Sequence, residues 1–167
     1  MENKNTGSIN KPISADAAKE LWDKNQKEFE LWALSLVGAK PRIRDDGIDG
    51  ILGFVESGNK KRKIIVQVKG GKSLTPGMIQ DLLGTIEKEE AAIGLLISLN
   101  RPILSIITDS VHAGSYESEL WKKKYLKIQI RTVGELVEGK SFDIPPTYSL
   151  LKKAPRVKKQ SETARLL

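Results

Sequence analysis

Apolar residues recur at helical spacing near the start of the chain. The positions that follow an i, i+3, i+4, i+7 pattern are Phe29, Trp32, Ala33 and Leu36. Such a pattern predicts a helical segment that packs one face against a core. Ser14 can cap this segment, so helical structure is predicted to begin at Ala15, and Gly38 is expected to end it.

The next part of the chain has two apolar runs separated by a turn. The first run spans residues 51–55, Ser-Gly-Asn follows at 57–59, and KIIVQVK occupies 63–69. In the second run, successive side chains alternate between two faces, which places Gln67 and Lys69 side by side. These features predict a β-hairpin.

Helices and strands alternate in the second half of the chain. A helix is predicted from Pro76 to Glu90, because proline at the first helical position lacks only an amide that has no partner there. Residues 93–99 form a continuous apolar run, which is typical of a strand covered on both faces. Further elements are predicted at 105–113 (helix), 127–132 (strand) and 133–138 (helix). This order predicts an α/β fold.

The length of 167 residues suits a single domain. Because the first dozen residues are polar, a flexible N-terminus is expected over residues 1–12. The folded domain is expected over 13–142. Beyond it, a proline pair and the basic run KKAPRVKKQ predict an extended basic arm over 143–167.

Composition excludes several kinds of chemistry. The chain has no cysteine, which excludes disulfides, thiolate metal clusters and cysteine nucleophiles, and which favours a cytoplasmic location. His112 is the only histidine in the sequence, so a cluster of histidine metal ligands is excluded. Apolar runs as short as residues 93–99 cannot span a bilayer, so no membrane association is expected.

Positive charge is concentrated toward the C-terminus. The formal net charge is +7, and residues 120–160 contain eleven Lys or Arg against three acidic residues. A one-sided basic surface suits phosphate binding, because each neutralised phosphate releases counterions, so nucleic acid is the expected partner. The alternative interpretation is a solvated basic tail. The lysines expected to contact DNA are Lys72, Lys122, Lys123 and Lys124.

One group of residues has the chemistry needed for phosphodiester hydrolysis. Mg²⁺ prefers oxygen ligands from carboxylates, carbonyls and water. Asp49 lies between glycines in the sequence Gly-Ile-Asp-Gly at 47–50, just before the first strand of the hairpin. If the hairpin pairs as predicted, Asp49 meets Gln67 and Lys69 at the same strand ends. The alternative is that Asp49 only forms the turn and that the polar strand residues face solvent.

These residues are part of a larger resemblance. Phe29-Glu30, Gly-Ile-Asp-Gly at 47–50 and Gln-Val-Lys at 67–69 together resemble the Mrr-like branch of the PD-(D/E)XK nuclease superfamily. A closer likeness is to the nuclease-like domain often attached to the C-terminal end of bacterial and phage DNA methyltransferases. It covers roughly residues 12–158. The segments that carry it are FELWALSLVGAKPR, DDGIDGIL, VQVKGGK, IQDLLGTIEKEEAAIGLLISL, AGSYES and KIQIRTVGELVEGK.

The resemblance implies a restriction-endonuclease-like fold with an αβββαβ core, in which helices flank a mixed central sheet of about four strands. It implies that Asp49 is the principal metal ligand and that Gln67 occupies a position that holds Glu or Asp in the wider superfamily. Val68 would offer its backbone carbonyl to the metal, and Glu30 would reach the metal directly or through water. Lys69 would orient the attacking water.

The implied activity is that of a Mg²⁺-dependent DNA endonuclease of restriction type, with Mn²⁺ as a substitute, which acts through metal-activated water. The alternative is a catalytically inactive DNA-binding module of the same fold that is associated with a DNA methyltransferase or a restriction-modification system. This alternative arises because the uncharged Gln67 binds a divalent ion more weakly than a carboxylate would. RNA is a third and weaker candidate for the substrate. Since one active site cuts one strand, double-strand cleavage would require a homodimer or two binding events.

Overall fold

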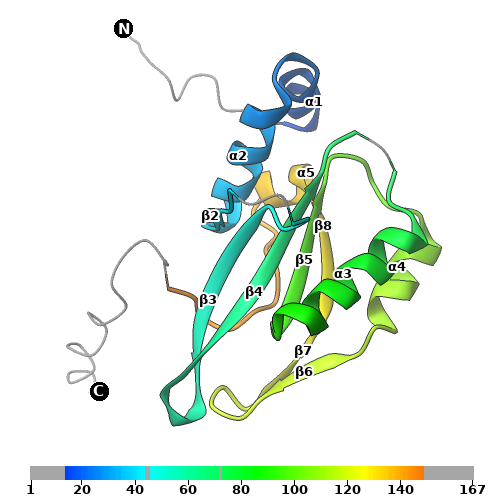
Figure 1. Cartoon of the computed structure of the whole chain (residues 1–167). Coiled ribbons are helices and arrows are strands. Elements are labelled where there is room, and N and C mark those ends of the chain that lie inside the picture. Colours follow the sequence, from blue (N-terminus) through cyan, green and yellow to red (C-terminus); the bar gives the residue numbers. More distant parts are fainter. Residues whose placement is uncertain (1–13, 44–45, 72, 149–167) are drawn as a thin grey trace, which may run out of the picture.

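A five-stranded mixed sheet lies at the centre of the protein, with helices on both faces (Figure 1). The computed structural model describes residues 14–43, 46–71 and 73–148. Pairing is antiparallel from β2 to β4 and parallel from β4 to β8. The predicted α/β fold is confirmed, and the two-residue strand β2 supplies the fifth strand. In spatial order the strands are β2 (Lys40–Pro41), β3 (Gly50–Glu56), β4 (Lys60–Lys69), β5 (Ile93–Ser98) and β8 (Ile128–Thr132).

Two groups of helices bury opposite faces of the sheet. The alternation of side chains along β4 divides the core between them, because Ile64 and Val66 pack with the first group and Ile65 packs with the second. All three side chains are fully buried, as expected for a strand covered on both faces. The first group is α1 (Ala15–Lys24), α2 (Gln26–Val37) and α5 (Val133–Val137), and the second is α3 (Pro76–Glu89) and α4 (Leu104–Val111).

The N-terminal segment forms two helices rather than the single helical run that its spacing predicts. Ser14 caps α1 as predicted, since its Oγ accepts a hydrogen bond from a first-turn amide at 3.1 Å. Asn25 then adopts an extended backbone, and its Oδ1 accepts a hydrogen bond from the amide of Glu28 at 3.1 Å, which starts α2. The break lets Trp22 of α1 meet Phe29 of α2 edge to face, with ring centroids 5.4 Å apart.

β3 and β4 form the predicted hairpin, and their unequal lengths create an opening in the sheet. The register pairs Gly50 with Val66 at one end and Glu56 with Lys60 at the other. β4 ends only at Lys69, so its last residues run past the first residue of β3. At that end β4 still pairs with β5 but no longer with β3, which leaves room for functional side chains.

The second half follows the predicted order of elements with one addition. α3, β5, α4, β8 and α5 occupy the predicted regions, and Thr75 caps α3 as its position before a proline suggests. The addition is a separate two-stranded hairpin of β6 (Ser115–Ser118) and β7 (Lys123–Leu126). These strands are short and polar, so their hydrophobic pattern does not reveal them.

The expected terminal segments are only partly described. The flexible N-terminus expected over 1–12 lies outside the described residues, and so does the basic arm from residue 149 onward. The described start of the arm lies against the sheet, because the amide of Tyr148 donates to the carbonyl of Gly53 at 2.9 Å. Among the helices of the described ranges, none is long and apolar enough to cross a membrane.

Candidate active site

Asp49 lies at the opening that β4 leaves beyond β3. Its backbone continues the ladder for one more step, since its amide donates to the carbonyl of Val66 at 3.0 Å. Its side chain then replaces the next backbone hydrogen bond between the strands, because Oδ2 accepts a hydrogen bond from the amide of Val68 at 2.7 Å. The carboxyl group is therefore fixed at the strand end by the backbone of β4.

The backbone carbonyl of Val68 faces the same opening. In a strand, the N–H and C=O of one residue point to the same side, which allows paired residues to exchange two hydrogen bonds. The N–H of Val68 points to the Asp49 carboxyl group. The carbonyl of Val66, two residues earlier, faces β3 in the same way. The Val68 carbonyl therefore projects toward the region of the Asp49 side chain.

Gln67 is buried beside this opening, with 6% of its surface exposed. Its Nε2 donates a hydrogen bond to the carbonyl of Gly47 at 2.7 Å, which ties β4 to the turn before Asp49. Because a primary amide donates from nitrogen and accepts at oxygen, this bond leaves Oε1 as the atom that can face a cation. Gln67 and Asp49 thus lie together at one end of the hairpin.

Glu30 of α2 forms a pair of carboxyl groups with Asp49. Burial, together with a hydrogen bond between the two side chains, raises the pKa of Asp49 to about 7. The amide of Val68 and the charge of Lys69 act in the opposite direction but are outweighed. Glu30 also pairs with Lys27 of the same helix at 3.3 Å. Two neighbouring carboxyl groups that repel each other when ionised favour a shared proton or a bound cation.

Lys69 completes the group at the last residue of β4. The charge of its ammonium reaches Asp49. Trp22 of α1 packs on the two glycines that follow: a Cβ on Gly70 would lie 2.4 Å from the indole Cε3, and one on Gly71 would lie 3.0 Å from Cζ2. Only residues without a side chain permit this close approach. Trp22 therefore positions the end of β4, a role whose sequence signal is the Gly-Gly pair after Lys69.

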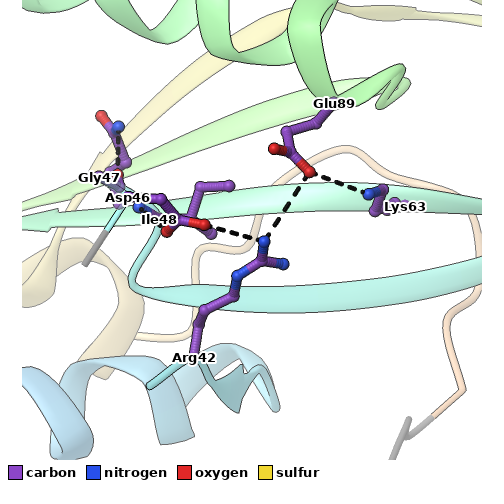
Figure 2. A network of polar contacts seen from close by, with 7 residues as sticks. Arg42, Asp46, Gly47, Ile48, Lys63 and Glu89 are labelled. Atoms are coloured by element: carbon purple, nitrogen blue, oxygen red, sulfur yellow. Dashed lines mark hydrogen bonds and ion pairs between the residues drawn. The ribbon is translucent and has the colours of Figure 1, made fainter. Parts of the chain in front are cut away.

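A network of ion pairs supports the turn before β3 (Figure 2). Nη2 of Arg42 lies 2.9 Å from Oδ2 of Asp46 and 3.8 Å from Oε1 of Glu89. Lys63 of β4 pairs with the same Glu89 oxygen at 3.2 Å, and Oδ1 of Asp46 accepts a hydrogen bond from the amide of Ile48 at 3.2 Å. The turn is thereby tied to β4 and α3. Sequence patterns assign no role to Arg42. The one feature that could have indicated its ion pair is the acidic residue four positions later.

Three of the four lysines expected to contact DNA lie away from this opening. Residues 122–124 lie at the β6–β7 hairpin, beside the far end of β3, where Nε1 of Trp121 donates to the carbonyl of Val55 at 3.0 Å. Lys72 lies outside the described residues. The predicted site residues that the structure brings together are Glu30, Asp49, Gln67, Val68 and Lys69.

The donor atoms at the opening suit a hard divalent cation. The described ranges contain no cluster of three or more Asp, Glu, His or Cys side chains that could hold a metal. The opening instead offers two carboxyl groups, an amide oxygen and a backbone carbonyl, from Asp49, Glu30, Gln67 and Val68. Mg²⁺ is commonly held by one or two carboxylates and keeps several waters. The residues present therefore fit Mg²⁺, and the closely held carboxyl pair is the main indication.

Comparison with known families agrees with this fold. A family model described as restriction endonuclease, of the Mrr catalytic type, matches residues 16–105, which is more than half of the chain. The matched range runs from α1 to the start of α4 and contains all five residues gathered at the opening. A search of curated proteins found no match. Since the family match and the helix-flanked mixed sheet agree, the chain belongs to the Mrr-like restriction endonuclease family of the PD-(D/E)XK superfamily.

Proposed function

We propose that the protein is a Mg²⁺-dependent DNA endonuclease of restriction type that hydrolyses phosphodiester bonds at the opening beyond β3. The observation that carries this proposal is the convergence of two carboxyl groups, an amide, a backbone carbonyl and an ammonium at one strand end. Membership of the restriction endonuclease family supports a nuclease and implies DNA as the substrate.

Four residues would hold the cation. Asp49 and Glu30 offer carboxylate oxygens, Gln67 offers Oε1, and Val68 offers its backbone carbonyl. When bound, Mg²⁺ or Mn²⁺ would supply positive charge to the phosphate group and lower the pKa of a water molecule. The hydrogen bonds from Val68 to Asp49 and from Gln67 to Gly47 hold these donors in place beforehand, which reduces the cost of binding.

Lys69 would act on the substrate side of the opening. Its ammonium carries three donors and a full positive charge, next to a carboxyl pair that would otherwise repel a phosphate. In this position it can orient a water molecule toward phosphorus and stabilise the negative charge that develops on the phosphate oxygens. The packing of Trp22 on the glycines after Lys69 restricts where the ammonium can lie.

A second candidate is a catalytically inactive DNA-binding module of the same fold. Gln67 favours this candidate, because an uncharged amide holds a divalent cation less strongly than the acid usual at this position. In the described residues, the site also lacks a third acidic side chain. The two candidates differ in metal binding, since an inactive module would bind DNA without binding Mg²⁺.

Two substitutions test the endonuclease with little change in side-chain shape. Asp49→Asn and Lys69→Met should each abolish nicking of supercoiled plasmid in Mg²⁺ or Mn²⁺, while Tm stays near that of the unmodified protein. Matched controls are Asp81→Asn and Lys88→Met, since both residues are exposed on α3.

The outcomes separate the two candidates. Cleavage by Asp49→Asn at the rate of the unmodified protein would refute the role of Asp49. If the unmodified protein binds duplex DNA but shows neither cleavage nor heat of Mn²⁺ binding by calorimetry, the inactive module is the correct interpretation.

The proposal also covers a homodimer, a partner protein and a cellular location. A homodimer would supply the second active site that double-strand cleavage needs, and sedimentation with and without duplex DNA measures it. A DNA methyltransferase partner fits the subgroup that the sequence resembles, and co-expression followed by affinity capture tests it. A cytoplasmic location fits a chain without cysteine, and fractionation of cells tests it.

A further inference from the structure

Two hairpins that are far apart in the sequence meet at the end of the sheet opposite the catalytic opening (Figure 1). They are the β3–β4 hairpin and the β6–β7 hairpin, and Glu56 joins them. Its Oε1 accepts hydrogen bonds from Oγ of Ser118 at 3.0 Å and from the amide of Leu120 at 2.8 Å, and its Oε2 accepts one from the hydroxyl of Tyr116. Glu56 is only 7% exposed, so a buried and multiply bonded carboxylate holds the hairpins together.

Exposed cations from both hairpins surround this junction. Lys61 pairs with Val55 in the β3–β4 register, and the carbonyl of Val55 accepts the indole N–H of Trp121 at 3.0 Å. The basic end of β4 and the basic turn before β7 are therefore neighbours. In the described part of the chain, no ion pair involves the lysines at positions 60, 61, 122 and 124. The exposed residues, which we call the hairpin surface, are Lys60, Lys61, Trp121, Lys122 and Lys124.

Neighbouring charges reduce this positive charge only in part. Lys123 is paired with Asp143 at 2.7 Å and is left out of the hairpin surface. Glu117 faces one of the lysines across the β6–β7 ladder, and Glu119 accepts a hydrogen bond from a serine of the other hairpin. Arg62, whose guanidinium lies over the Tyr116 ring, adds a further cation. The balance around the junction therefore stays positive.

The hairpin surface is too far from Asp49 to bind the phosphate that is cut. The length of β3 separates the hairpin surface from Asp49. This strand has seven residues, which span about 20 Å at roughly 3.3 Å per residue. At about 3.4 Å per base pair, this distance corresponds to roughly six base pairs of duplex. Any DNA bound there would be a segment outside the cleaved step.

We propose that the hairpin surface binds the phosphate backbone of duplex DNA at a distance from the catalytic opening. This proposal rests on the proposed function in one respect, which is that the bound polymer is DNA. Lysine ammonium groups bind phosphates as point charges without regard to sequence. The indole N–H of Trp121 is already used by the carbonyl of Val55, so its ring, 39% exposed, offers apolar surface to the sugars rather than a donor to base edges.

The expected effect is a change in the salt dependence of binding. Each phosphate neutralised by a cation contributes about 0.9 to the slope of log K against log salt concentration. Four lysines therefore contribute up to about 3.6 to that slope. Removing their charges should flatten the slope by a measurable part of this value and weaken binding most at low salt.

The test compares two variants of the full chain, each with four Lys→Gln substitutions. The first carries them at the lysines of the hairpin surface, Lys60, Lys61, Lys122 and Lys124. The control carries them at exposed lysines outside the junction, Lys19, Lys24, Lys88 and Lys140. Binding of a labelled 30-base-pair duplex is followed by fluorescence anisotropy in EDTA at several salt concentrations, and Tm verifies that both variants fold.

The first variant should show a flatter salt slope and weaker binding than the control. Cleavage by bound protein in a single turnover should be unchanged, because none of the four lysines lies at the opening. Equal slopes for the two variants would overturn the proposal, and so would a loss seen with single-stranded but not duplex DNA. If the unmodified protein never cleaves DNA but the first variant has a flatter salt slope, the endonuclease proposal is refuted and the DNA-binding role of the hairpin surface stands. If the unmodified protein cleaves DNA but the first variant keeps the same salt slope, only the role of the hairpin surface is refuted.

Discussion

Acid should weaken the junction between the two hairpins, because that junction is built on an ionised Glu56. Burial by itself raises the pKa of this carboxyl group, but hydrogen bonds from Tyr116, Leu120, Ser118 and Ser57 outweigh burial and lower the pKa from 4.5 to about 2. A group whose pKa is depressed by folding stabilises the folded state above its unfolded pKa. That stabilisation is lost as the pH falls through the folded pKa.

The size of the effect follows from the pKa change. At about 1.4 kcal/mol per pKa unit, the lowering from 4.5 to about 2 corresponds to a contribution of at most about 3 kcal/mol to the free energy of unfolding at pH 7. Near pH 3 the same relation leaves about half of it, and below pH 2 almost none remains.

Urea unfolding of the unmodified protein and of Glu56→Gln at several pH values measures this contribution. The difference in unfolding free energy should approach about 3 kcal/mol at pH 7 and shrink steadily between pH 4.5 and pH 2. Glu117→Gln is the matched control, because Glu117 is exposed on the same hairpin. A difference that is constant between pH 5 and pH 3 would refute the reasoning, since it would show that the charge of Glu56 is not what joins the hairpins.

Three further predictions concern the candidate active site at the opening beyond β3. Gly70→Ala places a methyl group 2.4 Å from the Trp22 ring, so it should lower Tm, cost about 1–3 kcal/mol of stability and reduce cleavage. Arg42→Met removes the 2.9 Å ion pair with Asp46, so cleavage should fall more than DNA affinity, as kcat and KM will show. Gln67→Glu adds a third carboxyl group and should tighten Mn²⁺ binding by about tenfold or more in calorimetry, since cation sites are tuned by ligand charge.

Each of these predictions has a clear contrary result. Gly84→Ala is the control for Gly70→Ala, because a Cβ on Gly84 meets nothing within 4 Å; equal loss of activity in both variants would dismiss the contact with Trp22. Unchanged kcat in Arg42→Met would show that the ion-pair network does not position the turn. Weaker Mn²⁺ binding by Gln67→Glu would place the cation away from this side chain.

Most of the secondary structure, and the key residues of the hairpin, could be predicted from local pattern. The alternation along residues 63–69 predicts a strand and places Gln67 beside Lys69, and Pro76 predicts the start of α3. These features depend on backbone sterics and on neighbours a few residues away. The division of the N-terminal helical segment at Asn25 also has a local cause. It is missed because the apolar residues keep helical spacing on both sides of the break.

Contacts between distant segments could not be predicted in this way. The β6–β7 hairpin has strands of four residues with little apolar pattern, and it is held by Glu56, about sixty residues earlier in the chain. Trp22 and Gly70 show the same limit, since each alone has an ordinary local explanation. Their roles appear only when the two segments pack together.

The sequence by itself determined the α/β order, the hairpin and the three polar residues, Asp49, Gln67 and Lys69, that one strand end can gather. Only the tertiary structure decided that Glu30 reaches Asp49 and that residues 122–124 lie at the opposite end of the sheet. The physical reason is range: short-range sterics and periodicity act within a few residues. The placement of a helix or hairpin on a sheet depends on the packing of side chains from the whole domain.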